Sequence, residues 1–168
     1  MAQVDIANIK TQIKSILDSA NTTTGTPIDL SNGLDTRVQQ VMKINPAKIY
    51  SDPGSFPFVS VFADSKTIEQ QTMGHKGNQR SALRRGDLVL NVVCAVQEPL
   101  IESVKADEAD ENVEQLMENI EEILRSNVDL NGSCNWAIPE DVTYQDAPWD
   151  EQTIVRGAIM TLNCTVWY

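Results

Sequence analysis

Histidine, cysteine and aromatic residues are scarce in this chain, and acids outnumber bases. The 168 residues include one histidine and three cysteines, and 13 bases stand against 24 acids, a net charge of −11. This charge argues against sequence-independent DNA binding, because neutralising phosphates requires a basic face. No apolar run approaches the roughly 18 residues of a membrane span, and the N-terminus, MAQVDIANIK, lacks the basic and apolar regions of a secretion signal. We therefore expect one soluble domain over residues 1–168, made in the cytoplasm.

The residue patterns of common enzymes are also missing. The three cysteines form no C-x-x-C pair, and no Gly-rich phosphate motif occurs. His75 lies in a polar, Gly-containing loop, which favours a surface histidine over a catalytic base. Cys94 and Cys164 each fall on an apolar strand face, where a thiol behaves as a small hydrophobe. We predict no catalytic, cofactor-binding or metal-binding residues.

What the chain does have is a separation of opposite charges. Ten acids and one base lie between Glu98 and Glu122, a local net charge of −9. The 17 residues from Gln70 to Gly86 contain no acid, and we interpret them as a flexible loop because of their glycines. The bases of this loop are Lys76, Arg80, Arg84 and Arg85. Segregated charges favour a protein that contacts copies of itself, and a solvated face beside a mobile loop is the alternative.

The first half of the chain predicts one helix followed by strands. Apolar residues recur with helical spacing from Ile6 to Leu17, and the polar segment at 22–25 ends this helix. The segment 29–44 is ambiguous between a short helix and an edge strand over 37–44, and we treat it as irregular. Strands are predicted at 56–63 and 66–72, and a third at 87–97 alternates apolar and polar residues.

The second half predicts a longer helix and two strands. Apolar residues from Val113 to Leu124 follow a helical period, so we expect a helix over about 107–126 with Asp107 as its N-cap. Strands follow at 141–144 and 153–168, separated by a turn near Ala147 and Pro148. The order of elements predicts an α+β fold, a mainly antiparallel sheet with both amphipathic helices packed on one face.

Two further features have competing interpretations. The glutamates of the second helix resemble a metal cluster in spacing, but they lack oxygen ligands converging from other elements, so a solvated face is favoured. Trp149 follows Pro148 in a turn-like stretch, where burial within one subunit is hard to achieve. An interface role and local packing are equally compatible with this position.

The order of these elements resembles the tail terminator family of long-tailed bacteriophages, also called tail completion or minor tail proteins. The similarity covers most of the chain and rests on its pattern of elements, without a catalytic motif. The segments that carry it are IANIKTQIKSILDSA, FPFVSVF, DLVLNVVCAVQEP, ENVEQLMENIEEILRSN and VTYQDAPWDEQTIVRGAIMTLNCTVWY.

This resemblance implies a structural virion protein at the head-proximal end of the tail. Its subunits would form a ring, expected to be a hexamer, on the last ring of tail-tube protein. The ring would stop tube polymerisation and join the tail to the head connector, and genomic DNA would pass through it without specific binding. The loop at 70–86 would order on assembly, with Lys76, Arg80, Arg84, Arg85 and Trp149 as interface residues.

Other functions remain open from the sequence. A head–tail joining (neck) subunit or a tail-tube subunit belongs to the same structural class. A nucleic-acid-contacting packaging protein that uses the four basic residues, and a metal hydrolase that uses the acidic helix, belong to different classes.

Overall fold

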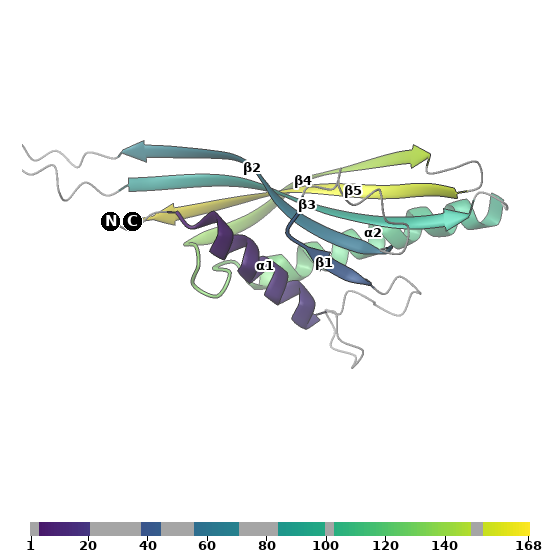
Figure 1. The fold of residues 1–168 in the computed structure, drawn as a ribbon, viewed down its shortest axis with the longest axis horizontal. Helices are drawn as coiled ribbons and strands as arrows, with labels where there is room; N and C mark the ends of the chain where they lie inside the picture. The colour runs from purple at the N-terminus through teal and green to yellow at the C-terminus, as the bar shows by residue number, and fades with distance from the viewer. Residues whose placement is uncertain (1–3, 21–37, 45–55, 71–83, 100–102, 149–152) are drawn as a thin grey trace, which may run out of the picture.

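A computed structural model describes residues 4–20, 38–44, 56–70, 84–99, 103–148 and 153–168. These ranges form a sheet in the strand order β1-β2-β3-β5-β4, in which only the β1–β2 pair is parallel. Both helices lie against the same side of the sheet (Figure 1). We call this side the inner face and the opposite side the outer face. The predicted α+β fold with a mainly antiparallel sheet is confirmed.

Helix α1 (Ile6–Ala20) forms where the apolar spacing predicts it. Asp5 caps its first turn, because its side-chain Oδ1 accepts a hydrogen bond of 3.0 Å from the backbone N–H of Asn8. The apolar stripe is buried against the sheet and the second helix, which fixes the orientation of α1. Its buried members are Ile9, Ile13, Ile16, Leu17 and Ala20.

Helix α2 (Ser103–Ser126) begins four residues earlier than predicted, so the assignment of Asp107 as N-cap is wrong. Residues 103–106 contain no proline or glycine, and nothing in them prevents the helix from starting at Ser103. The predicted apolar stripe is confirmed: all six of its residues are buried. They are Val113, Leu116, Met117, Ile120, Ile123 and Leu124.

Strands β3 (Arg84–Pro99) and β5 (Thr153–Trp167) form the centre of the sheet. Their register pairs Leu90 with Leu162 and Val92 with Met160 on the inner face, where all four side chains are fully buried. The predicted β5 is confirmed to within a residue. The predicted β3 is extended at both ends, so Arg84 and Arg85 belong to a strand and not to the basic loop.

Strand β2 (Phe58–Gln70) is one strand where the sequence suggested two. Its register against β3 shifts between Ala63 and Ser65, which leaves Asp64 as the extra residue of a β-bulge. A bulge interrupts the alternation of faces without ending the strand. The polar residues around Asp64 therefore gave the false appearance of a gap between two strands.

Strand β1 (Gln40–Met42) corrects the interpretation of 29–44 as irregular, although residues 29–37 lie outside the described part of the chain. Gln40 to Met42 pair with Phe58 to Ser60 of β2. Three residues are too few to show a strand period, and the neighbouring strand supplies the hydrogen bonds that define β1.

Strand β4 (Trp136–Pro148) is much longer than the predicted 141–144 and runs through the expected turn at Ala147 and Pro148. Its register against β5 shifts between Pro139 and Val142, so Glu140 and Asp141 form a second bulge. Proline and a bulge are tolerated together in an edge strand, and among the described residues β4 has a strand partner on one side only. Pro139 and the bulge interrupt the alternation of apolar and polar residues, so the sequence pattern did not reveal the full length of β4.

Candidate assembly surface

The sequence-predicted interface residues are only partly within the described structure. Lys76, Arg80 and Trp149 lie outside the described residues, as does His75. Arg84 and Arg85 begin strand β3, beside the last residues of β5. Their side chains point to opposite faces of the sheet, because neighbouring residues of a strand alternate. The two arginines therefore belong to two different surfaces.

Arg85 lies on the outer face and is already paired within its own subunit. Its Nε donates a hydrogen bond of 3.0 Å to Oδ1 of Asp87, and its guanidinium carbon is 6.0 Å from the centroid of the Trp167 ring. Thr165 Oγ1 donates a further hydrogen bond of 2.8 Å to the same Asp87 oxygen. This cluster orients Arg85 and satisfies much of its charge before any partner arrives.

Arg84 differs because its side chain is exposed at the inner-face end of β3. Its backbone forms two hydrogen bonds with Tyr168, of 2.9 Å and 3.0 Å, so the chain is well positioned there. Among the described residues, none forms an ion pair with Arg84. Arg84 is therefore the better candidate of the two for an intermolecular contact.

The outer edge of β4 exposes two large apolar side chains on the outer face. Trp136 and Ile138 are 46% and 47% exposed, and they pair across the sheet with Thr165 and Asn163. They border a shallow hollow of about 300 Å³ that reaches Arg85. Trp136 and Ile138 were missed as interface candidates, although Trp-x-Ile before Pro139 is the alternation of an edge strand.

The opposite border of the sheet is formed by β2. Strand β1 pairs with only the first three residues of β2, so in the described structure the stretch from Val61 to Gln70 has β3 as its one strand partner. This border carries the Asp64 bulge and Ile68, which is 53% exposed. The two borders of the sheet thus differ in side chains and in length.

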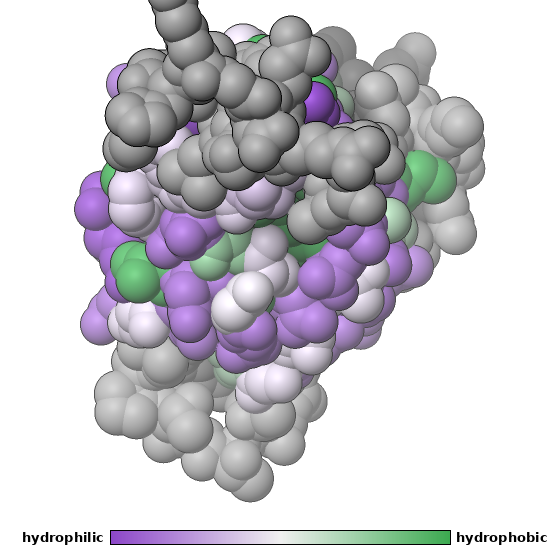
Figure 2. Space-filling model, turned by 90° about the vertical axis from the view of Figure 1, so that its left-hand side faces the viewer, coloured by the Kyte–Doolittle hydropathy of each residue, from purple (hydrophilic) through white to green (hydrophobic). Residues whose placement is uncertain are grey.

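The space-filling view looks onto the end of the molecule where α1 and β3 begin and β5 ends (Figure 2). The surface left visible by the grey atoms is mostly hydrophilic with separate hydrophobic spots. A polar surface with isolated apolar side chains is typical of the rim of a protein interface, where charge pairs select the partner. The centre of an interface is usually more apolar.

The acidic side of α2 is largely solvated. Two of its acids have described partners: Glu121 pairs with Arg125 at 2.7 Å, and Asp110 pairs with Arg156 of β5 at 2.8 Å. The exposed carboxylates are those of Glu111, Glu114, Glu118 and Glu122. Within the described residues, no three His, Cys, Asp or Glu side chains converge in a manner suited to a metal ion.

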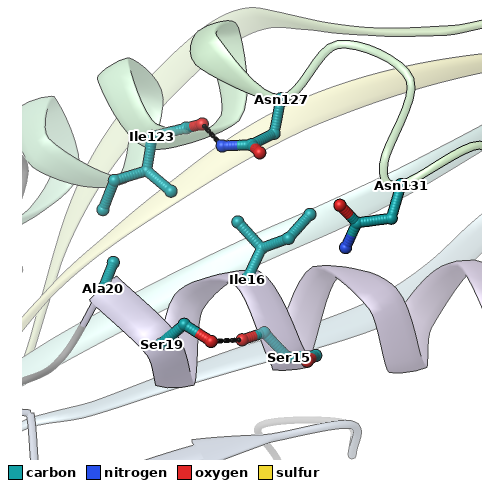
Figure 3. A pocket seen from close by; sticks show the side chains of 7 residues that line it. All are labelled: Ser15, Ile16, Ser19, Ala20, Ile123, Asn127 and Asn131. Atoms are coloured by element: carbon teal, nitrogen blue, oxygen red, sulfur yellow. Dashed lines mark hydrogen bonds between the residues drawn. The ribbon is translucent and has the colours of Figure 1, made fainter.

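A groove of about 340 Å³ separates the C-terminal halves of the two helices (Figure 3). Ile16 and Ile123 form its apolar walls. Two of its polar side chains form hydrogen bonds: Asn127 Nδ2 donates to the Ile123 carbonyl at 2.8 Å, and Ser19 Oγ donates to the Ser15 carbonyl at 2.8 Å. With these two donors engaged, the groove offers few groups to orient a polar ligand.

The described cysteines are buried on the inner side of the sheet. Burial raises the pKa of the Cys94 thiol to about 12, so it stays protonated at neutral pH and is unsuited to nucleophilic attack. Cys134, in the segment between α2 and β4, lies beside Cys164 of β5. Both have free thiols.

Comparison with models of known protein families finds none that matches the chain, and comparison with curated proteins finds no match either. Neither helix in the described part of the chain is long and apolar enough to cross a membrane.

Proposed function

We propose that this chain is a structural subunit of a homo-oligomeric ring, and specifically a tail terminator of a long-tailed bacteriophage. The observation that carries the proposal is the pair of unlike sheet borders. Strand β4 presents Trp136 and Ile138, whereas the part of β2 that has only β3 as a described strand partner presents Asp64 and Ile68. Different surfaces on opposite sides of a subunit suit head-to-tail contacts, and such contacts produce a ring when the rotation closes.

The distribution of charge supports the same arrangement. Four carboxylates of α2 are exposed, and Arg84 at the start of β3 has no described ion-pair partner. Surfaces of opposite sign on one subunit select the orientation of an identical neighbour and repel the wrong one. We infer that the charged surfaces set the orientation of neighbouring subunits and that the sheet borders supply the apolar contacts between them.

The bulges favour a terminator over a tail-tube subunit. In the described part of the chain, both borders of the sheet are interrupted, by Asp64 on β2 and by Glu140 and Asp141 on β4. Natural sheets use bulges, charges and prolines to prevent continuous edge-to-edge pairing. A subunit with both borders interrupted is suited to closed assembly and poorly suited to extending one sheet indefinitely.

In the proposed role, the ring lies at the head-proximal end of the virion tail. One side contacts tail-tube protein and stops its polymerisation, and the other contacts the head–tail connector. Genomic DNA passes through the ring without specific binding, in keeping with the net charge of −11. The protein would be assembled into the virion in the host cytoplasm.

Size-exclusion chromatography with light scattering, followed by electron microscopy, tests this proposal. We expect rings from the purified protein or from its mixture with tube protein, and tubes of limited length in its presence. Ile138→Lys should keep the fold and lose assembly, because it places a charge on the β4 border. Val128→Lys is the matched control, since Val128 is 50% exposed but lies outside the sheet.

Two results would overturn the proposal. One is a protein that stays monomeric and leaves tube length unchanged. The other is long tubes formed by this protein alone, which would indicate a tail-tube subunit.

A further inference from the structure

Cys134 and Cys164 are brought together by elements far apart in the sequence. Ala137 of β4 pairs with Cys164 of β5, and the Asn135 N–H, next to Cys134, bonds to the carbonyl of Thr165, next to Cys164. The interaction between the two thiols is the largest cause of the pKa shift of each. The 29 residues between them include all of β4 and β5 as far as Asn163.

The backbone around Cys134 is held firmly in place. The Asn135 N–H donates a hydrogen bond of 2.9 Å to the Thr165 carbonyl, and the Trp167 N–H donates one of 2.7 Å to Asn135 Oδ1. The Cys134 thiol itself lies 3.8 Å from the Val128 carbonyl oxygen. These bonds join the segment that carries Cys134 to the strand that carries Cys164, so the backbone holds the two cysteines close together.

The two thiols differ in a way that assigns each a chemical role. Cys134 is 7% exposed and Cys164 is 1% exposed, so Cys134 is the less buried residue of the two. The hydrogen bond from Cys164 lowers the pKa of Cys134, and the same contact together with burial raises the pKa of Cys164. A more acidic, more accessible thiol beside a second thiol is the usual arrangement of an oxidisable pair.

We propose that Cys134 and Cys164 form a reversible intrachain disulfide when the protein meets a peroxide. The Cys134 thiolate attacks one oxygen of hydrogen peroxide, the O–O bond breaks, and hydroxide leaves, which gives a sulfenic acid on Cys134. The Cys164 sulfur then attacks the Cys134 sulfur and displaces its hydroxyl. With the thiol protons counted, two thiols and one peroxide give one disulfide and two water molecules.

The consequence of this bond is a covalent connection between the segment after α2 and strand β5. Closing the loop reduces the freedom of the unfolded chain. In a reducing cytoplasm the thiols stay free, and in an oxidising environment the bond persists. The inference concerns the subunit alone and is independent of the proposed ring.

The test uses the full-length reduced protein treated with dilute hydrogen peroxide, then alkylated and digested with trypsin. Trypsin cleaves at Arg156, between the two cysteines, so the disulfide joins peptide 126–156 to peptide 157–168. We expect this joined pair, the loss of two hydrogen atoms from the intact mass, and a melting temperature about 5–10 °C higher that dithiothreitol reverses.

Cys94 provides the internal control, because it is fully buried and lies on a separate tryptic peptide, 86–105. Cys94→Ala should leave the joined pair unchanged. Cys164→Ser should leave a sulfenic acid on Cys134 that dimedone traps. Oxygen addition to the wild type without the joined pair, or a disulfide that includes Cys94, would overturn the inference, and neither outcome depends on whether the variants fold.

Discussion

Arg156 of β5 and Asp110 of α2 form an ion pair of 2.8 Å that joins the helix to the sheet. The same guanidinium donates a hydrogen bond to Asp146 of the neighbouring strand β4. The Arg156 side chain is 22% exposed and the Asp110 side chain 49%, so solvent screens the pair mainly from the carboxylate side. Both carboxylates raise the pKa of Arg156, through the hydrogen bond to Asp146 first of all. One side chain thus connects three elements.

Replacing this arginine should measurably destabilise the subunit. Arg156→Met keeps much of the side-chain volume but leaves two carboxylates without their shared partner, and we expect a loss of about 1–2 kcal/mol in unfolding free energy. Urea denaturation measures it. Lys14→Met is the control, because it removes the exposed Lys14–Asp18 pair of α1, worth about 0.3–0.5 kcal/mol. Equal losses in both variants would contradict the assigned role of Arg156.

Gly86 and Val4 should be energetically coupled. A Cβ atom added at Gly86 would lie 2.5 Å from Cγ2 of Val4, and Val4 is buried. Gly86→Ala therefore has to displace the Val4 side chain, and we expect a cost of about 1 kcal/mol or more. In a double-mutant cycle with Val4→Ala, the combined loss should be smaller than the sum of the single losses. Simple additivity would show that the two side chains do not compete for this space.

Arg84 and Arg85 should respond differently to charge reversal. Arg85→Glu places a carboxylate beside Asp87 and removes their ion pair, so we expect the subunit itself to lose about 1 kcal/mol of stability. Arg84→Glu should leave unfolding unchanged, because no described residue pairs with that side chain, and should impair assembly. Denaturation curves and ring counts by electron microscopy separate the two effects. Normal rings from Arg84→Glu would exclude Arg84 from the interface.

Stability should fall at alkaline pH in a manner that depends on Cys94. Burial raises the pKa of its thiol from 9.0 to about 12, so between these values the unfolded chain releases a proton that the folded chain retains. The free energy of unfolding then decreases as pH rises, by up to about 1.4 kcal/mol per pH unit. This contribution is fully present below pH 9 and lost as pH approaches 12. Cys94→Ala should show a shallower decline in the same titration.

The helices and the central strands were predictable because their patterns are long and regular. Six apolar residues of α2 and the alternation of β3 from Leu88 to Val96 each repeat over several periods. A long pattern of one period specifies both the type of element and the face that it buries. The predicted packing of both helices on one side of the sheet follows from those faces.

The sheet borders were less predictable because irregular features define them. Bulges at Asp64 and at Glu140 and Asp141 shift the alternation in mid-strand, which split β2 in two and shortened β4. Strand β1 depends on a partner remote in the sequence. For the same reason Trp136 and Ile138 were overlooked: their exposure depends on β4 being at the edge of the sheet, which only the strand order reveals.

The two bulges also affect the geometry of any larger assembly. A β-bulge bends its strand and increases the local right-handed twist. A neighbouring subunit that packs against either border of this sheet therefore contacts a bent and twisted strand. Its orientation is rotated relative to that of the first subunit. The same rotation repeats at each added subunit. The bulges at Asp64, Glu140 and Asp141 would therefore help to determine how many subunits close a ring.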